Sequence, residues 1–426
     1  MKKSIKTTLM ALMACLAFLT ELSAQFSLSA EVRPRTEFRH GFKRPLATQL
    51  NPALFTEQRT RLTSTFVSDK FDLKVSFQDV RIWGAASQIY KSDPALQNIY
   101  EGWAAYKFDD RHALAMGRME LDYDNARILG NLDWAQQGRS HDLVKYTYSG
   151  SNASFHVGAA FNQDANTPEF AKLEGTLLTG VNSYKTMQFA WYNKKWDKGT
   201  LSLLFLNNGM QAADSSVNFT QTMGLYGTKS IGNKGLEYEF YYQTGKDIAG
   251  RNVSGILAAA NFTLWRTNPN NLNVGFDYVS GNRSDTDRNE AFDPLYGTHH
   301  KFYGFMDYFY VGSPHMNKGL IDGFVKAKCK TGDNSVLMAH VHEFFTASEI
   351  GLSETGNKLS ATLGTEIDLV YNQKVAPGIV LHVGYSQMFY TDSMVFLKGT
   401  PDARSNASWA WAMISFKPTL FTSKAE

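Results

Sequence analysis

EQRTRLTSTF (residues 57–66) and FDLKVSFQDVRIWG (residues 71–84) alternate polar with apolar residues along two neighbouring stretches of the chain. In the first stretch Arg59 and Arg61 share one parity, and Leu62 lies on the other. Successive side chains of a β-strand point to opposite faces, so a period of two indicates a strand whose faces meet different environments. The two stretches therefore predict neighbouring strands, each with one polar and one apolar face.

The same alternation begins at Phe26 and continues towards the end of the chain. Between Phe26 and Arg39 the apolar residues occupy even positions, and the charged residues occupy odd ones. Near Gln78 the parity slips, which predicts a β-bulge or an end of the apolar band. Alternation recurs in residues 100–108, 155–162, 236–243, 272–278, 359–369 and 379–386, and the last strand is expected at SWAWAMISF, residues 408–416.

Short connectors rich in turn residues separate some strands, and long connectors separate the others. The long ones span residues 84–97, 163–183, 208–219 and 281–300. About 400 residues, at roughly 22 for each strand with its connection, predict about 18 strands, with 16 as the alternative. The expected fold is all-β: one transmembrane antiparallel β-barrel with short periplasmic turns and longer extracellular loops.

The amino terminus has the pattern of a secretory signal. A basic start is followed by the apolar run Leu9–Leu19 and by a small residue, Ala24, at the expected cleavage position. Residues 1–24 are therefore expected to be a signal peptide, and residues 25–426 a single barrel domain in the outer membrane of a Gram-negative bacterium. The alternative is a lipoprotein with Cys15 as its lipid-bearing cysteine.

Composition agrees with a membrane barrel. Aromatic residues make up 13% of the chain, and membrane barrels place aromatic girdles at both interfaces. The formal net charge is +3, which does not favour a nucleic-acid-binding protein. The expected partners are the lipid of the outer membrane and the barrel assembly machinery, without nucleic acid.

Several motifs resemble the alginate export family of outer-membrane barrels. They are EQRTRL, QDVRIWG, YEGWAAYKF, GRMELDYDNARILGNLDW and GRSHD between residues 57 and 142, and FDPLYGTHHKFYGFMDYFYVG at residues 292–312. The resemblance implies a monomeric, porin-like barrel of 18 strands whose arginine-lined lumen passes an anionic polysaccharide.

On that resemblance six arginines line the lumen: Arg59, Arg61, Arg81, Arg118, Arg127 and Arg139. Carboxylates on the same strands would hold them in place: Asp79, Glu101, Glu120, Asp122, Asp124, Asp133 and Asp142. Guanidinium suits this task because it stays charged and meets a carboxylate in a planar, two-bond fit. From residue 57 to residue 145 there are 12 Lys and Arg against 13 Asp and Glu, so the pattern predicts a wet lumen of both signs on consecutive strands.

The expected function is passage of an anionic solute, with an anionic polysaccharide or oligosaccharide such as alginate as the named cargo. The alternatives are a general diffusion porin for small nutrients and a structural or adhesive barrel. An enzyme is not expected: Ser140, His141 and Asp142 are adjacent, and neighbours on a strand point to opposite faces and cannot form a triad.

No cofactor is expected, and three groups of residues in the sequence are candidates for a metal site. The loop carboxylates Asp285, Asp287 and Asp293 offer hard oxygen ligands of the kind that Ca²⁺ prefers. The adjacent His299 and His300 are expected to point in different directions. Two further histidines, at positions 340 and 342, share one strand face and are expected as a lumen-facing pair.

Overall fold

The structure is a computed structural model of the chain. It describes residues 24–86, 96–163, 172–174, 177–178, 183–310, 315–353 and 356–423. The expected signal peptide, apart from Ala24, lies outside the described residues. Among the described residues, no helix has the length and apolar character that a membrane crossing needs.

Alternating polar and apolar residues form long strands, as expected. The strands are β1 (Ala24–His40), β2 (Ala53–Ser68), β3 (Phe71–Ile82), β4 (Leu96–Lys107), β5 (His112–Met119), β6 (His141–Ser149), β7 (Ala153–Phe161), β8 (Thr186–Trp196), β9 (Gly199–Gln211), β10 (Val217–Ile231), β11 (Lys234–Lys246), β12 (Asn252–Thr267), β13 (Asn270–Val279), β14 (Leu320–Gly332), β15 (Ser335–Phe345), β16 (Thr362–Ala376), β17 (Ile379–Tyr390), β18 (Ala407–Phe416) and β19 (Thr419–Thr422). Two short helices lie in connections: η2 (His299–Lys301) and α2 (Asp392–Lys398).

The strands close into one barrel. Each strand from β1 to β17 pairs with the next in the chain, and β1 pairs antiparallel with both β2 and β18. The short β19 continues β18 along β1 after a break at Lys417 and Pro418, so the wall has 18 strands. The expected transmembrane antiparallel barrel is confirmed, with 18 strands rather than 16.

The apolar parity faces outwards and the polar parity faces inwards. Leu62 and Phe77 are 43% and 55% exposed, whereas Arg59 and Ser76 are 0% and 1% exposed. A water-soluble protein shows the reverse, because its apolar side chains gain free energy by leaving water. An outward apolar band around a polar interior is the arrangement of a barrel surrounded by lipid.

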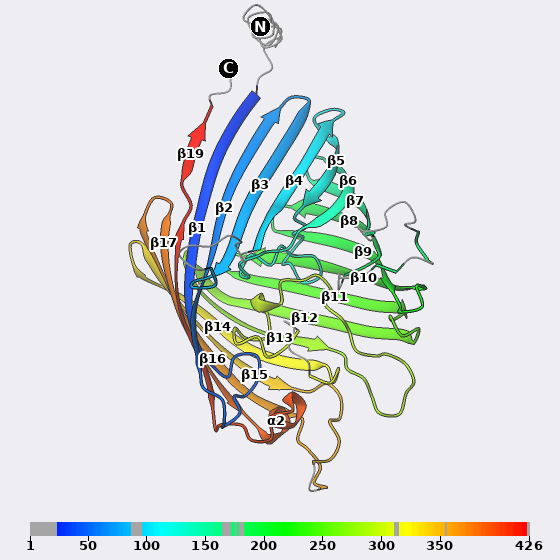
Figure 1. Ribbon diagram of the computed structural model, residues 1–426, viewed down its shortest axis with the longest axis vertical. Helices are drawn as coiled ribbons and strands as arrows, with labels where there is room; N and C mark the ends of the chain where they lie inside the picture. The colour runs from blue at the N-terminus through cyan, green and yellow to red at the C-terminus, as the bar shows by residue number, and fades with distance from the viewer. Residues whose placement is uncertain are drawn as a thin grey trace, which may run out of the picture.

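The connections differ in length between the two ends of the barrel (Figure 1). β1 begins and β19 ends beside the short turns, and the long connections lie at the opposite end (Figure 1). Two expected loop lengths need correction. The connection between β9 and β10 is only residues 212–216, because both strands extend into the expected loop. The connection between β13 and β14 is longer than expected and spans residues 280–319.

The segment from Glu120 to Ser140 is not part of the strand wall, contrary to the sequence prediction. β5 ends at Met119 and β6 begins at His141, and the residues between them form a loop. This segment is called the first inward loop, because Ile128 and Leu129 are 2% and 1% exposed although they belong to no wall strand. The arginines and carboxylates of this segment thus reach the interior from a loop.

Residues 280–319, described except for 311–314, form the second inward loop. Leu129 pairs with Tyr296 in an isolated parallel bridge, and Tyr296 donates from its backbone N–H to the Ile128 carbonyl at 3.0 Å. The two loops also share an apolar core inside the barrel, to which they contribute Leu121, Ile128, Leu129, Phe292, Tyr303, Met306, Tyr308 and Phe309. The loops thus form one packed unit within the barrel.

Candidate functional site

Arginines of the wall hold the first inward loop on one side. The Arg59 Nη2 atom lies 2.7 Å from a Glu31 carboxylate oxygen and 2.8 Å from an Asp133 carboxylate oxygen. Arg33 donates to the Asp133 backbone carbonyl at 2.7 Å and to the Gln136 side chain at 3.2 Å. Burial opposes the charge of Asp133, but Arg59 and Arg33 lower the pKa of its carboxyl to about 2. Most of these bonds are charge-assisted, which makes them stronger than neutral ones.

Trp134 connects the wall to both inward loops. Arg35 stacks over its ring, with the guanidinium carbon 4.2 Å from the ring centroid, and donates to its carbonyl at 2.7 Å. The Trp134 ring also stacks on the ring of His300 of the second inward loop, at a centroid distance of 4.4 Å. His300 in turn bonds Asp307 at 2.7 Å. Arg35, Trp134 and His300 therefore link β1 to both loops.

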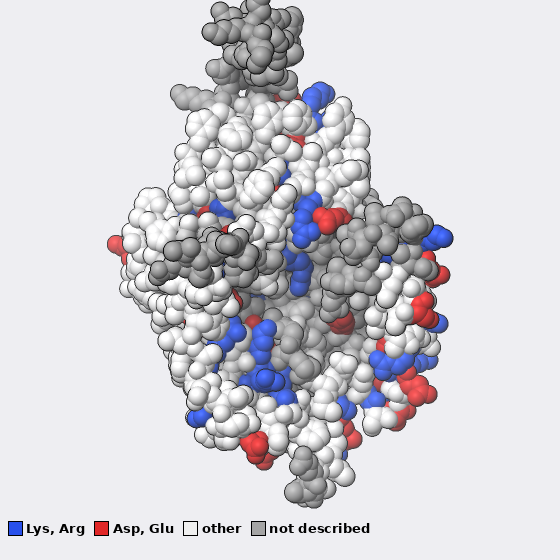
Figure 2. Space-filling model, viewed as in Figure 1, with Lys and Arg blue, Asp and Glu red and all other residues white. Residues whose placement is uncertain are grey.

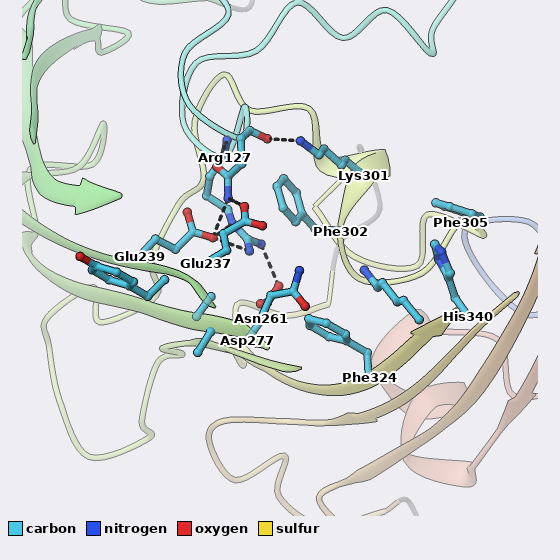
Figure 3. A pocket seen from close by; sticks show the side chains of 15 residues that line it. Arg127, Glu237, Glu239, Asn261, Asp277, Lys301, Phe302, Phe305, Phe324 and His340 are labelled. Atoms are coloured by element: carbon cyan, nitrogen blue, oxygen red, sulfur yellow. Dashed lines mark hydrogen bonds and ion pairs between the residues drawn. The ribbon is translucent and has the colours of Figure 1, made fainter. Parts of the chain in front are cut away.

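Arg127 anchors the first inward loop on the opposite side of the barrel. Its guanidinium lies 2.6 Å from Glu239 of β11 and 2.9 Å from Asp277 of β13 (Figure 3). It also donates to the Tyr303 hydroxyl at 2.9 Å. Burial disfavours the charge of this side chain, but Asp277 and Glu239 raise the pKa of Arg127 well above its usual value. Arg127 is thus a buried anchor with its carboxylate partners in place.

Cavities lie around the inward loops, and Figure 2 shows the viewed face hollowed at its centre, with Lys and Arg side chains around the hollow. The rim cavity has a volume of about 730 Å³ and includes Arg118, Arg139, His141, Tyr184 and Tyr296 in its lining. The mouth cavity has a volume of about 490 Å³ and includes Arg35, Arg39, Lys43, Arg139 and His300. The inner cavity has a volume of about 260 Å³ and includes Arg127, Lys301, Phe305, Phe324, Lys326 and His340 (Figure 3).

Arg139 lines both the rim cavity and the mouth cavity. Its side chain donates to the Gly297 carbonyl at 3.0 Å, and it forms no ion pair with a carboxylate of the described residues. Burial lowers the pKa of Arg139, while the guanidinium remains charged at neutral pH. A partly desolvated cation without a carboxylate partner is suited to attract an anion.

Two predicted lumen residues, Asp79 and Arg81, face outwards instead. Thr60 of β2 lies opposite Asp79, and Thr60 is on the outer parity of its strand. Asp79 and Arg81 pair with each other at 2.6 Å on this face. The parity slip is therefore an end of the apolar band, where charged residues follow Phe77 on the same outer face.

Arg118 also departs from the predicted position. It follows Leu114 and Met116, both exposed, on the outer parity of β5. It pairs with Asp142 at 3.0 Å at the end of the strand, where both residues line the rim cavity. The ion pair thus lies at the rim of the barrel. The neighbouring His141 bonds the Tyr184 hydroxyl through Nδ1 at 2.9 Å.

A β-bulge brings both Tyr100 and Glu101 into the interior. The register of β3 and β4 shifts between Ser76 and Phe77, and Tyr100 and Glu101 are 2% and 4% exposed. Strict alternation over residues 100–108 would place the neighbours Tyr100 and Glu101 on opposite faces, and the bulge turns both inwards instead. Glu101 pairs with Lys74, and Arg61 stacks over the Tyr100 ring at 3.6 Å.

The remaining predicted carboxylates belong to the first inward loop. Glu120 accepts a hydrogen bond from the Tyr100 hydroxyl at 2.5 Å, and Asp124 accepts from Ser202 and Trp191 of the wall at 2.5 and 3.1 Å. Asp122 is exposed. Glu120 and Asp124 thus attach the loop to the wall through hydroxyl and indole groups rather than through the predicted arginines.

Several functional residues were missed by the sequence reasoning. Arg33 and Arg35 of β1 bind the first inward loop, Glu239 and Asp277 bind Arg127, and Lys301 and Lys326 line the inner cavity. The missed residues on wall strands lie on the polar parity of their strands, and this parity is the sequence signal that indicates an inward-facing side chain. Their partners were not readable, since they come from positions more than 90 residues away in the chain.

The predicted loop carboxylates do not gather around a common point. Asp285 pairs with Arg283 at 3.7 Å, and Asp293 caps the Leu295 backbone N–H at 2.9 Å. Asp287 is not part of a group that could hold a metal. Across the described ranges the His, Asp and Glu residues close enough to share a metal ion are His340, His342 and Asp368.

The family model described as alginate export matches residues 24–410. The chain belongs to the alginate export family. The resemblance seen in the sequence motifs is confirmed, and membership places the protein in the outer membrane of a Gram-negative bacterium as a porin-like channel. The short turns of this alginate export family member therefore face the periplasm, and the long loops face the cell exterior.

Solved porins of Pseudomonas aeruginosa share the fold. OccK5 (OpdH) has a TM-score of 0.61 at 10% identity, over 93% of this chain and 98% of that one. OccK2 (OpdF), solved in complex with glucuronate, has a TM-score of 0.60 at 12% identity, over 93% and 98%. OpdK, solved with vanillate, has a TM-score of 0.57 at 9% identity, over 92% and 98%. Among curated proteins the search found no match to this alginate export family member.

Proposed function

We propose that this channel passes small organic anions of about the size of a sugar acid. The observation that carries the proposal is Arg139, a cation shared by two cavities at the extracellular mouth and unpaired with any carboxylate of the described residues. Polar groups that fix a small ligand usually lie in cavities of about 300–1,000 Å³, and the rim and mouth cavities have about 730 and 490 Å³.

The inner cavity continues the same chemistry towards the periplasm. Lys301 and Lys326 line it, and neither pairs with a carboxylate within the part of the chain that the structure describes. Arg127 pairs with both Glu239 and Asp277, and Glu237 has no Lys or Arg partner among the described residues. The described lining thus has three Lys and Arg side chains and three carboxylates, but Lys301 and Lys326 are held in no ion pair and remain available to an anionic solute.

The inward loops favour a small solute over a long polymer. They pair with each other inside the barrel and are tied to its wall through Arg59 on one side and Arg127 on the other. A polysaccharide would have to thread past this packed unit, whereas a small anion can occupy the cavities around it. Two porins of the same fold were solved with small carboxylates, glucuronate and vanillate, which supports this solute class.

Planar-bilayer recording tests the proposal. In a KCl gradient we expect the sign of the reversal potential to show that the channel passes Cl⁻ more readily than K⁺. We also expect glucuronate to reduce the KCl current in a concentration-dependent way. Arg139→Gln should move the reversal potential towards cation selectivity and weaken the block by glucuronate, because it removes the unpaired charge.

Arg81→Gln is the matched control, since it removes the same charge from the outer face of the wall. Cation selectivity of the unaltered channel would overturn the proposal. Equal behaviour of the Arg139 and Arg81 variants would overturn the role of Arg139. Block by polymeric alginate at lower concentration than by glucuronate would favour polysaccharide passage instead.

A further inference from the structure

His340, His342 and Asp368 come together on the inner face of the wall, and of the three His340 lines the inner cavity. His340 and His342 occupy alternate positions of β15, so they share one face. His340 lies directly opposite Asp368 of β16 in the strand register. One ligand atom from each of the three side chains lies within 4.8 Å of the others. In a tetrahedral zinc site such atoms are roughly 3.3 Å apart, a difference that side-chain rotation can close.

The three side chains have ligand atoms free for a metal ion. His342 Nδ1 bonds the Asp322 carboxylate at 2.8 Å, and since a carboxylate only accepts, this nitrogen carries the proton and leaves Nε2 as the ligand atom. His340 Nδ1 and Asp368 Oδ2 have no hydrogen-bond partner among the described residues. The second Asp368 oxygen accepts from the Ser386 hydroxyl at 2.5 Å, which orients the carboxylate.

Asp322 and Ser386 supply the outer support that metal sites require. Histidine ligands usually donate their second ring N–H to a carboxylate, which fixes the tautomer and the ring orientation. Asp322 does this for His342, and both residues are buried, at 0% and 1% exposure. The support comes from β14 and β17, so four consecutive strands contribute to the cluster.

The charge of the cluster also calls for a cation. Asp322, Glu366 and Asp368 are all at most 1% exposed, and none forms an ion pair with a Lys or Arg of the described residues. Lys326 of β14 interacts electrostatically with Asp322 and Asp368 without forming an ion pair, and its ammonium lies 4.3 Å from the centroid of the Phe324 ring. A single lysine can balance only one of the three buried carboxylates, and a bound divalent ion would lower the cost of burying the others.

We propose that His340, His342 and Asp368 bind one divalent transition-metal ion of the Zn²⁺ class. Two imidazole nitrogens and one carboxylate suit Zn²⁺ and similar ions, whereas Ca²⁺ and Mg²⁺ prefer oxygen ligands. His340 also lines the inner cavity, beside Phe305 and Phe324 (Figure 3). The ion therefore enters from the cavity. Three protein ligands leave a fourth position open, as in catalytic rather than structural zinc sites.

The test uses the full barrel, purified in detergent without a histidine tag and stripped with a chelator. Zn²⁺ is titrated by calorimetry, and Co²⁺ is added as a spectroscopic probe. We expect one Zn²⁺ per chain and visible Co²⁺ absorption of tetrahedral intensity. His340→Asn, His342→Asn and Asp368→Asn should each abolish this absorption. Asp322→Asn should keep the ligands but weaken Zn²⁺ binding by about 10–100-fold, because it removes the support of His342.

His382→Asn is the matched control, since His382 lies on β17 and bonds Asn372 instead of a carboxylate. It should leave Zn²⁺ binding unchanged. Heat-modifiable migration on a gel confirms that each variant is folded. Because His340 is only half-buried at the cavity, its variant should disturb the wall least.

A proton shared between the carboxyl groups of Glu366 and Asp368 is the competing explanation, because it would satisfy the buried Asp368 oxygen without a metal. Absence of stoichiometric Zn²⁺ binding, or binding unaffected by His340→Asn and His342→Asn, would favour the shared proton and overturn the metal site. No solute is present in this experiment, so its result is independent of the proposed function.

Discussion

Arg59 of the barrel wall and Asp133 of the first inward loop lie 2.8 Å apart, and the arginine side chain is completely buried. The loop residue is 74 positions away in the chain from its partner. Arg59 therefore serves to fix the loop inside the barrel, and its guanidinium is not open to a passing solute. Predictions for the loop and its anchors follow from this role.

Asp133→Asn should loosen the first inward loop from β1 and β2. The substitution removes a charge from the contact with Arg59 and Arg33, at a cost of about 1–3 kcal/mol of loop attachment. We expect larger conductance and more frequent current fluctuations in single-channel recordings. Asp122→Asn, which neutralises an exposed carboxylate of the same loop, is the control. Identical traces for the two variants would contradict the anchoring role.

Loop attachment should depend on acidic pH through Asp133. Its folded pKa of about 2 is lower than the ordinary value of about 3.9, so the stabilisation is complete above about pH 4. It is lost as the pH falls from about 4 towards 2, because the carboxyl then takes up a proton. Current fluctuations should therefore rise over this range. The Asp133→Asn channel should lack that step, and a step of equal size in it would assign the effect to another group.

Arg127→Met should destabilise the barrel strongly. It leaves Glu239 and Asp277 buried beside each other without their cation, and breaking a buried ion pair costs about 3–5 kcal/mol. The free energy of unfolding in urea from lipid vesicles measures the loss. Arg81→Met, at a half-exposed pair on the outer face, should cost about 0–1 kcal/mol. Similar losses for both variants would show that Arg127 is not an anchor.

Gly297→Ala should separate the two inward loops. A Cβ atom at this position would overlap the Arg127 carbonyl oxygen of the first inward loop, so the backbones have to move apart. Overpacking of this kind costs about 1–3 kcal/mol. We expect increased proteolytic cleavage within residues 120–140 in the folded barrel. Gly323→Ala, at a position of β14 without a positive φ and where a Cβ meets nothing within 4 Å, tests for effects outside the loop contact. Protection of residues 120–140 equal to that of the unaltered protein would argue against this contact.

Much of the wall could be predicted from the sequence, because the signal for it is local. Leu62 and Arg59 differ in parity, and this alone decides that one meets lipid and the other the interior. Two positions show the limit of parity. The bulge at Tyr100 and Glu101 turns both inwards, and Asp79 ends the apolar band on the outer face. A bulge depends on the register with a neighbouring strand, which no single stretch contains.

The sequence by itself determined a barrel with a polar interior, since a period of two repeated along the chain requires two different surroundings for the two faces. Chain length predicted about 18 strands with 16 as the alternative, and the structure decided for 18. Only the tertiary structure decided what the interior charges do. Arg59 and Arg127 are buried anchors, Arg139 is unpaired at two cavities, and His340 and His342 meet Asp368 across a strand pair. The partner of a charge is set by which distant segments close the barrel and fold into it, and local alternation holds no information about that.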